Sequence, residues 1–252
     1  MNLSPVSLGT ATPNGTPAGL LISTWNVWFE KHHREERNRA LLAELQSHRP
    51  HLMTFQEVTP PFIRALLATE WLKDGYWISA TEHNQIGVVM VGRVPVQSLR
   101  FETLTSNMGR RLLVAELEGG LTVASAHFES TRGAGESRAK QYAEAAELLQ
   151  RSPAAVLTGD FNSDIQAPEN AGLGELTDAW SQLHPDEPGY TVDTEANNML
   201  NKREHSMVRV RMDRIYTRGE AKATEVKLLG RQPFAPDLFP SDHFGLLAEI
   251  RR

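Results

Sequence analysis

AAVLTGDFN, residues 154–162, is an apolar run that ends abruptly in an acid and an amide. The alternation of a strand would place the side chains of Asp160 and Asn162, two residues apart, on the same face. A carboxylate beside an amide can take a proton from a water molecule while the amide orients that water. Taken alone, the run is equally well explained by an Asx turn after Gly159, so its meaning depends on the rest of the chain.

Five other apolar runs end in the same manner. Each closes with an acid, an amide or an imidazole: TWN at 24–26, FQEV at 55–58, AHFES at 126–130, RMDR at 211–214 and SDHFG at 241–245. Polar residues commonly follow strands because turns need them, so a single ending of this kind is weak evidence. Six of them predict strands that converge on one cleft.

Two of these endings carry a chemical expectation. Glu57 closes an apolar strand, where a carboxylate must be solvated, paired or bound to a cation; taken alone, an ordinary strand-end acid is the more frequent case. A carboxylate can hold the imidazole of His243 in one tautomer. Because adjacent residues seldom pair directly, Asp213 is a better partner for His243 than Asp242.

The available ligand types indicate a hard cation. The chain has no cysteine, and its candidate ligands are mostly oxygen atoms. Mg²⁺ is commonly held by one or two carboxylates together with water and phosphate, whereas zinc prefers clustered histidines. The only adjacent histidines are His32 and His33, inside the charged run EKHHREER, which indicates a solvated loop or a helix start.

Periodicity predicts an α/β chain with many strands and few helices. The expected helices span 34–48, 59–72 and 135–151, the last with Ala139, Ala143, Ala146 and Leu149 facing inward. The expected strands span 20–27, 51–58, 76–80, 86–91, 99–103, 111–117, 121–128, 154–162, 208–218 and 244–252. This order lacks regular strand–helix alternation, so two packed sheets with helices outside are the economical arrangement.

The domain organisation predicted for the 252 residues is simple. Residues 1–19 are rich in proline, glycine and small polar residues, without the basic start and long apolar run of a signal peptide, which predicts a flexible tail. No linker or charge run divides 20–252, which indicates a single domain. No stretch approaches the length of a membrane span.

Charge and composition limit the possible partners and compartment. The net charge of −5 does not fit a protein that coats duplex nucleic acid by charge alone, although a nuclease with a local basic site remains compatible. The lack of cysteine fits a reducing compartment. We therefore expect an intracellular protein, cytoplasmic or, in a eukaryote, nuclear.

The motifs in their order resemble the endonuclease/exonuclease/phosphatase superfamily, from about Ser23 to the C-terminus. The superfamily pattern is a strand ending in Asn, then Gln-Glu, a strand ending in His, Gly-Asp-x-Asn, a later Asp and a final Ser-Asp-His. The matching residues here are Asn26, Gln56–Glu57, His127, Gly159–Asp160–Asn162, Asp213 and Ser241–Asp242–His243. The resemblance implies a four-layer α/β sandwich, with two packed mixed sheets flanked by helices.

Within that superfamily, three stretches resemble the 5′-tyrosyl-DNA phosphodiesterases. They are TWN, AHFESTRG at 126–133, and a long segment that begins at DAW (178–180), continues through GYTVDTEANNML (189–200) and ends in VRMDRIYTR (210–218). This likeness implies Mg²⁺-dependent hydrolysis, with Mn²⁺ as a possible substitute, of 5′-phosphotyrosyl links between DNA and a trapped protein. Such a reaction belongs to DNA repair.

The resemblance also implies roles for individual residues. Glu57 would bind the metal with Asn26 beside it, and Asp160 would activate water that Asn162 orients. His243 and His127 would donate to phosphate oxygens, with Asp213 and Asp242 orienting the site. The expected substrate contacts are Asn26, Ser130, Thr131, Arg132, Trp180 and Asn197. The expected partner is single-stranded DNA whose 5′ end carries a tyrosyl or peptide adduct, bound by a monomer without a membrane.

Three positions depart from the family pattern. Val27–Phe29 follow the first asparagine where an acid and a glycine are usual, Asp164 lies close to where an arginine is usual, and Gln85 aligns with an aromatic residue. The pattern therefore also fits an apurinic endonuclease, a general nuclease, or a lipid or inositol phosphatase. A binding module that has lost catalysis is a further alternative, against which the intact acids, amide and histidine argue.

Overall fold

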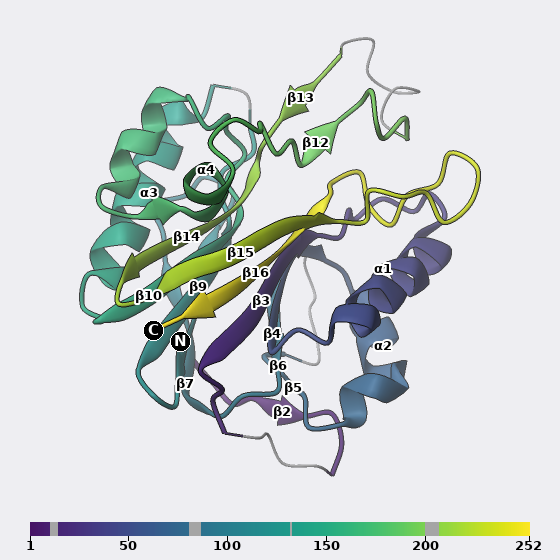
Figure 1. The fold of residues 1–252 in the computed structure, drawn as a ribbon, viewed down its shortest axis with the longest axis horizontal. Coiled ribbons are helices and arrows are strands. Elements are labelled where there is room, and N and C mark those ends of the chain that lie inside the picture. The colour runs from purple at the N-terminus through teal and green to yellow at the C-terminus, as the bar shows by residue number, and fades with distance from the viewer. Residues whose placement is uncertain (11–14, 81–86, 132, 200–206) are drawn as a thin grey trace.

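Two seven-stranded mixed sheets lie face to face in the computed structural model, which describes residues 1–10, 15–80, 87–131, 133–199 and 207–252 (Figure 1). The first sheet has the order β1 (Asn2–Leu3), β7 (Val96–Thr103), β8 (Arg111–Leu117), β9 (Leu121–His127), β10 (Ala154–Asp160), β14 (Asp213–Gly219), β11 (Thr177–Asp178). The second has the order β15 (Lys222–Leu229), β16 (Gly245–Arg251), β3 (Gly19–Asn26), β4 (Leu52–Val58), β6 (Gly87–Gly92), β5 (Trp77–Ile78), β2 (Val6–Ser7).

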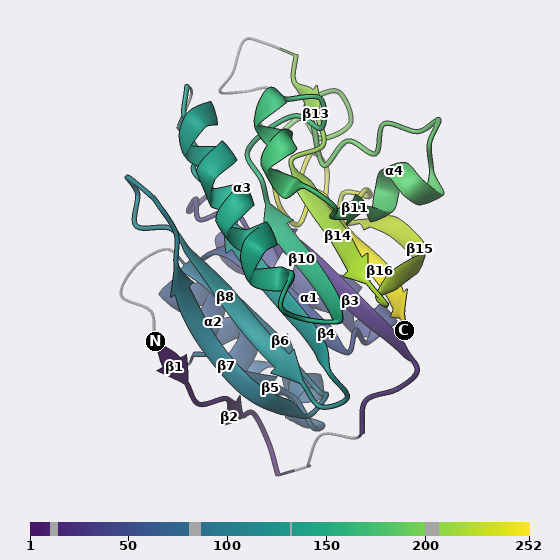
Figure 2. The ribbon, with the colours of Figure 1, turned by 90° about the vertical axis from the view of Figure 1, so that its left-hand side faces the viewer.

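Helices cover the outer faces of both sheets. α1 (Arg34–His48) and α2 (Pro60–Ala68) lie against the second sheet, and α3 (Gly135–Leu149) lies across the first (Figures 1 and 2). Shorter elements complete the fold: the 3₁₀ helices η1 (Glu70–Lys73) and η2 (Pro168–Leu173), the helix α4 (Ala179–Leu183), and a small hairpin of β12 (Val192–Asp193) and β13 (Arg209–Val210). The predicted four-layer α/β sandwich is confirmed.

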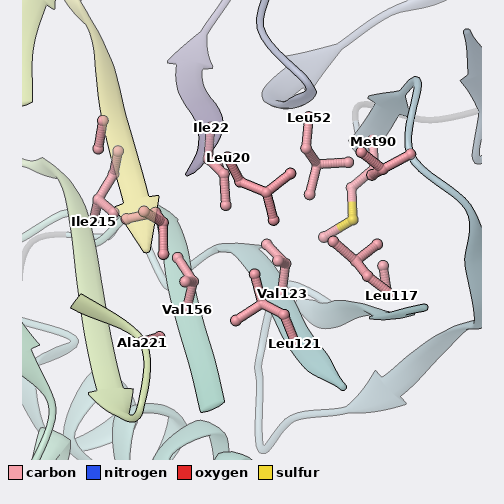
Figure 3. Packing of buried hydrophobic residues seen from close by; sticks show 14 of the residues in the cluster. Leu20, Ile22, Leu52, Met90, Leu117, Leu121, Val123, Val156, Ile215 and Ala221 are labelled. Atoms are coloured by element: carbon pink, nitrogen blue, oxygen red, sulfur yellow. The ribbon is translucent and has the colours of Figure 1, made fainter. Parts of the chain in front are cut away.

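The largest apolar core fills the space between the two sheets. Ile22 and Leu52 from the second sheet pack there with Val123 and Val156 from the first (Figure 3). β3 runs parallel to β4, and β9 runs parallel to β10, so each pair of strands ends at one edge of its sheet. β14 and β16 run antiparallel to β10 and β3, so they begin where those strands end. This topology brings the six polar endings to one end of the sandwich.

The first residues correct one prediction. Asn2–Leu3 pair with β7 of the first sheet, and Val6–Ser7 pair with β5 of the second, so the expected loose tail contributes an edge strand to each sheet. Leu3 and Leu8 also pack against the cores. Local composition could not reveal this, because both partners lie about seventy or more residues away.

The inward face of α3 was predicted only in part, because Ala146 and Leu149 are buried as expected but Ala139 and Ala143 are not. Its buried residues are Arg138, Gln141, Tyr142, Ala145, Ala146 and Leu149, whereas Ala139 is half-buried and Ala143 is exposed. The face is turned because Tyr142 buries far more surface than an alanine, and because Arg138 and Gln141 find polar partners in Glu169 and Glu129.

Smaller differences concern the strands and one helix. The expected strand 208–218 is broken into β13 and β14, and β15 was not predicted. The expected helix 59–72 ends at Ala68 and continues only as η1. No helix in the described part of the chain has the length and apolar character needed to cross a membrane.

Candidate active site

The predicted strand endings meet at one end of the sandwich. Asn26 Nδ2, at the end of β3, donates to Asp160 Oδ2, at the end of β10, over 2.9 Å. His127 Nε2, at the end of β9, lies 3.5 Å from the same oxygen. Strand register also pairs Asp160 with His127 on one side and with Asp213 on the other. The prediction that these endings converge is therefore confirmed.

A buried ion pair lies next to this group. His243 Nδ1 is 2.7 Å from Asp213 Oδ2. Burial opposes the charge on this imidazole, but the carboxylates of Asp213 and Asp242 outweigh it and hold the pKa of His243 well above its ordinary value. Nε2 of His243 has no hydrogen-bond partner among the described residues, so the protonated ring can donate to a bound anion.

Asp160 is placed to remain ionised. Burial raises its pKa, but the imidazoles of His127 and His243 and the amide of Asn26 outweigh this and hold the pKa of Asp160 below its usual value. The backbone N–H of Asn162 also donates to its Oδ1. An ionised, buried carboxylate beside an imidazolium is a suitable proton acceptor.

Burial keeps His127 a neutral imidazole, and Arg110 selects its tautomer. Burial lowers the pKa of His127 to about 4. Arg110 Nη1 lies 3.2 Å from His127 Nδ1, and because a guanidinium only donates, Nδ1 must accept. The ring proton therefore resides on Nε2, which faces Asp160. Arg110 Nη2 also donates to Ser130 Oγ, 3.1 Å away.

Glu57 fits the role of a cation ligand. Burial, followed by the nearby Asp242 carboxylate, raises the pKa of Glu57 to about 7. Oε2 of Glu57 accepts the backbone N–H of Phe29 over 2.9 Å, and no basic side chain in the described residues forms an ion pair with this carboxylate. A partly buried carboxylate near Asp242 and Asp160 is unfavourable by itself, and a divalent cation would reduce that cost.

A second set of ligand atoms lies beside it. Asp160, Asp213 and His243 offer atoms within 4.8 Å of one another and could hold a metal ion. Asp160 already accepts from Asn26, and Asp213 Oδ2 already contacts His243 Nδ1, whereas Asp213 Oδ1 has no hydrogen-bond partner among the described residues. Oε1 of Glu57 likewise has no hydrogen-bond partner there, and Oε2 accepts only the backbone N–H of Phe29. The donor set as a whole suits a hard cation such as Mg²⁺.

The backbone is strained around the site. Trp28, Glu57 and Asn162 have φ values of 58°, 59° and 53°, a left-handed conformation that costs about 1–3 kcal/mol for such residues. The pairing of β4 with β6 also shifts between Phe55 and Val58, which interrupts the alternation of side chains at Glu57. The left-handed backbone at these positions gives their side chains directions that a regular strand would not allow.

The expected substrate contacts are not all alike in the structure. Ser130 and Thr131 are exposed, and Ser130 Oγ accepts from Arg110, whereas Arg132 lies outside the described residues. Asn197 is buried and its Nδ2 donates to Ser241 O over 2.8 Å, so it clamps the turn that carries His243. Trp180 does not lie with the others: its ring is buried in the core and its Nε1 donates to Glu187 O.

Periodicity could not identify Arg110. It lies in the loop between β7 and β8, where no pattern marks it. Buried Glu129 holds that loop in place, because its carboxylate accepts Ser106 Oγ over 2.7 Å and the backbone N–H of Asn107 over 3.1 Å. Gln141 Nε2 of α3 donates to the same carboxylate.

Arg37 was missed although the sequence held a signal for it. It shares a helix face with Leu41 and Leu45, at spacings of four and eight residues, and all three are buried. Its guanidinium stacks 4.5 Å from the ring of Trp28. It donates to five backbone carbonyls, those of Val27, Trp28, Glu30, His32 and Pro240. Arg37 thus shapes the loop that brings Phe29 to Glu57.

The departures from the family pattern have local explanations. Trp28 occupies the position of the missing acid and is buried under Arg37. Asp164 is exposed and accepts the backbone N–H of Gln166, so it forms a turn. Gln85 lies outside the described residues. His32 and His33 are exposed at the start of α1, as expected.

The sequence was also compared with protein families. The profile of the Endonuclease/Exonuclease/phosphatase family matches residues 23–243. The chain belongs to this family. The match begins just before Asn26 and ends at His243, so it contains every strand ending that meets at the candidate active site.

Within this family, the chain is similar to several curated proteins and solved structures. Tyrosyl-DNA phosphodiesterase 2 of Gallus gallus is 30% identical over 248 residues, which are 91% of this chain and 66% of the relative. The Homo sapiens protein of the same name is 28% identical, covering 98% of this chain and 72% of its own. The chain thus spans about two thirds of the length of such relatives. A crystal structure of D. rerio TDP2 complexed with single-strand DNA product superposes with a TM-score of 0.84 at 24% identity, covering 94% of this chain and 100% of that one.

Proposed function

We propose that this chain is a Mg²⁺-dependent phosphodiesterase that hydrolyses 5′-phosphotyrosyl links between DNA and a trapped protein. The observation that carries the proposal is the contact of Asn26 and His127 with Asp160, beside the His243–Asp213 pair. A carboxylate base next to a protonated imidazole suits attack of water on a phosphodiester. The relatives named tyrosyl-DNA phosphodiesterase 2 support the choice of substrate.

The side chains divide the work as follows. Asp160, ionised and held by Asn26, takes a proton from the attacking water, and Asn162 orients that water. His243 donates from Nε2 to a non-bridging phosphate oxygen, with its Nδ1 proton held by Asp213. His127 offers its Nε2 proton beside it. Asp242, next to Glu57 and His243, maintains the charge of His243.

Glu57 is the proposed metal ligand, with Asn26 beside it. Bound there, Mg²⁺ would neutralise charge on the phosphate and the departing oxygen, and Mn²⁺ can take its place. Glu57→Gln should therefore raise the metal concentration needed for half-maximal activity. Activity that persists in excess chelator would exclude this role.

Single-stranded DNA with an adducted 5′ end is the proposed partner. Ser130, Thr131 and Arg132 form the proposed cradle for it, and Asn197 supports the site through Ser241. Trp180 is proposed to act indirectly, by holding the turn that ends at Glu187. We infer that residues 20–252 act as one catalytic domain of a monomer, because all six strand endings come from one chain. A DNA substrate further supports an intracellular location.

The leaving group supplies the decisive test. A tyrosine phenol has a pKa of about 10, whereas a sugar hydroxyl is nearer to the value of about 15.7 for water. Among the described residues the site offers candidate metal ligands, a base and phosphate donors, but no group placed to protonate an alkoxide. The enzyme should thus prefer an aryl leaving group.

The test compares two oligonucleotides of one sequence, one bearing a 5′-phosphotyrosyl group and one unmodified. We expect a higher kcat/KM for the first, measurable turnover of a p-nitrophenyl phosphodiester, and no turnover with chelator. Asp160→Asn is the control for contaminating nucleases and should lose about 10²–10⁴-fold in rate. Equal cutting of the unmodified strand would indicate a general nuclease. Preference for abasic DNA would indicate an apurinic endonuclease, and preference for an inositol phosphate would indicate a phosphatase of that class.

A further inference from the structure

Four central strands carry the same series of residues on the face between the sheets. Along each strand, towards the site, an aliphatic residue is followed two positions later by a hydroxyl residue and two positions after that by a polar residue. The four series are Ile22–Thr24–Asn26 on β3, Leu52–Thr54–Gln56 on β4, Val123–Ser125–His127 on β9, and Val156–Thr158–Asp160 on β10. Strand register aligns Thr24 with Thr54 and Ser125 with Thr158. The space between the sheets is thus layered, and the aliphatic layer, part of which Figure 3 shows, is the one farthest from the site.

The middle layer joins the two sheets by hydrogen bonds. We call Thr24, Thr54, Ser125 and Thr158, all buried, the hydroxyl layer. The hydroxyls of Thr54 and Thr158 lie 3.0 Å apart, across the gap between β4 and β10. Gln56 Nε2 donates to Thr24 Oγ1 on its own sheet and to Ser125 Oγ on the other, each over 3.1 Å.

These contacts are adjacent to both halves of the candidate active site. Along β10, Thr158 lies two residues before Asp160, and along β9, Ser125 lies two residues before His127. Gln56 directly precedes Glu57. The next bond across the gap is the one from Asn26 to Asp160. The hydroxyl layer is therefore the last cross-sheet contact below the reacting groups.

Replacing a pair of hydroxyl groups between the sheets by an apolar pair should change the distance between the sheets more than it changes the stability of the protein. Two carbon atoms pack best at about 3.5–4.0 Å, so a pair of valines would hold the sheets roughly 0.5–1 Å further apart than the 3.0 Å hydroxyl contact does. Replacing both partners of a buried hydrogen bond by apolar groups of the same shape is nearly neutral or stabilising. The layer is thus poorly explained as a device for stability.

We propose that Thr54 and Thr158, with Gln56 and Ser125, are positioning residues that set the spacing between the two halves of the active site. One half comes from the second sheet and holds Asn26 and Glu57. The other comes from the first sheet and holds His127 and Asp160. The effect on kcat can be measured only if the proposed function is correct, so that part of the inference rests on the proposed function. The effect on the separation of the two halves can be measured by crystallography whatever the substrate is.

The test is the double variant Thr54→Val/Thr158→Val. We expect kcat to fall about 10–100-fold, as a displacement of up to 1 Å can cause, with KM changed less than threefold. The free energy of unfolding should be unchanged or higher. Thr54→Ser/Thr158→Ser keeps both hydroxyls and should recover most of kcat.

Thr122→Val is the matched control. Thr122 is a buried threonine of β9 that bonds Ser152 at the strand's other end, 2.7 Å away, and its replacement should leave kcat within twofold. A double variant with wild-type kcat, one that fails to fold, or one that the serine variant does not rescue would overturn the proposal.

Crystal structures separate this inference from the proposed function. The double variant should show a wider Asn26–Asp160 separation than the wild type, and Thr122→Val should not. An unchanged separation would refute the positioning role even if the wild type is active. A wild type that cleaves no phosphodiester would refute the proposed function, while the structural comparison would still decide the spacing.

Discussion

Arg110 is the residue that joins His127 to the exposed Ser130. Its neighbour Arg111 lies on β8 with its guanidinium 4.0 Å from the ring of Phe101. Arg110→Ala should lower kcat/KM on a phosphodiester at least tenfold, because His127 loses the donor that selects its tautomer. Arg111→Ala should stay within twofold. An equal loss of kcat/KM in the two variants would show that the positive charge of each arginine matters, and not the contact of Arg110 with His127.

The ionisation of His127 should be visible in stability. Its pKa is about 4 in the folded protein and about 6.5 in an unfolded chain, so between these values the unfolded state binds a proton that the folded state does not. Stability should therefore fall as pH drops from about 6.5 towards 4, by about 2 kcal/mol at pH 5.

Comparison with His127→Gln isolates this contribution. The raised pKa of Glu57 has the opposite effect, stabilising the metal-free protein as pH falls from about 7, but it is present in both proteins and cancels in the difference. Urea denaturation of metal-free protein at pH 7 and pH 5 provides the measurement. A difference between the two proteins that does not change with pH would contradict the assignment of a neutral His127.

At the scale of elements, α1 determines the loop that follows β3. Arg37 enters this loop from the helix and satisfies five carbonyls, and each carbonyl left without a partner costs about 1–3 kcal/mol. Arg37→Met should lower the free energy of unfolding by roughly 3 kcal/mol, whereas Arg39→Met, on the exposed face of the same helix, should change it by less than about 0.5 kcal/mol. Thermal and urea unfolding would measure both. A similar change in the free energy of unfolding for the two variants would mean that the carbonyl groups of the loop form other hydrogen bonds when Arg37 is replaced.

At the scale of the whole molecule, the first residues link the edges of both sheets. Deletion of residues 2–9 removes β1, β2 and the partly buried side chains of Leu3 and Leu8. We expect this deletion to lower the free energy of unfolding by about 1–3 kcal/mol, a typical value for burial of one or two aliphatic side chains. Because no residue of this segment contacts the site in the described structure, kcat should remain within twofold. A loss of activity at full stability would place the segment in the substrate path.

The sequence by itself determined most of the central elements and the strand endings that meet at the site. The predicted bounds 34–48 and 111–117 are those of α1 and β8, because periodicity over a whole helix or strand depends on neighbouring residues only. His127 and Asp160 meet because β9 and β10 are parallel and end at one edge of the first sheet. Asn26 comes from the second sheet, and its approach to Asp160 was expected only from the shared pattern of strand endings.

Only the tertiary structure decided which groups support these residues. Arg110 and His127 are 17 positions apart, and Arg37 and Pro240 are 203 apart. Trp180 was expected in the substrate path but is buried in the core, and the expected loose tail pairs with both sheets. Such contacts depend on how segments that are distant in the sequence pack against each other, and local periodicity carries no information about this packing. The chemistry of each strand ending is a local property, whereas the partners that hold it in place are chosen by the packing of the two sheets.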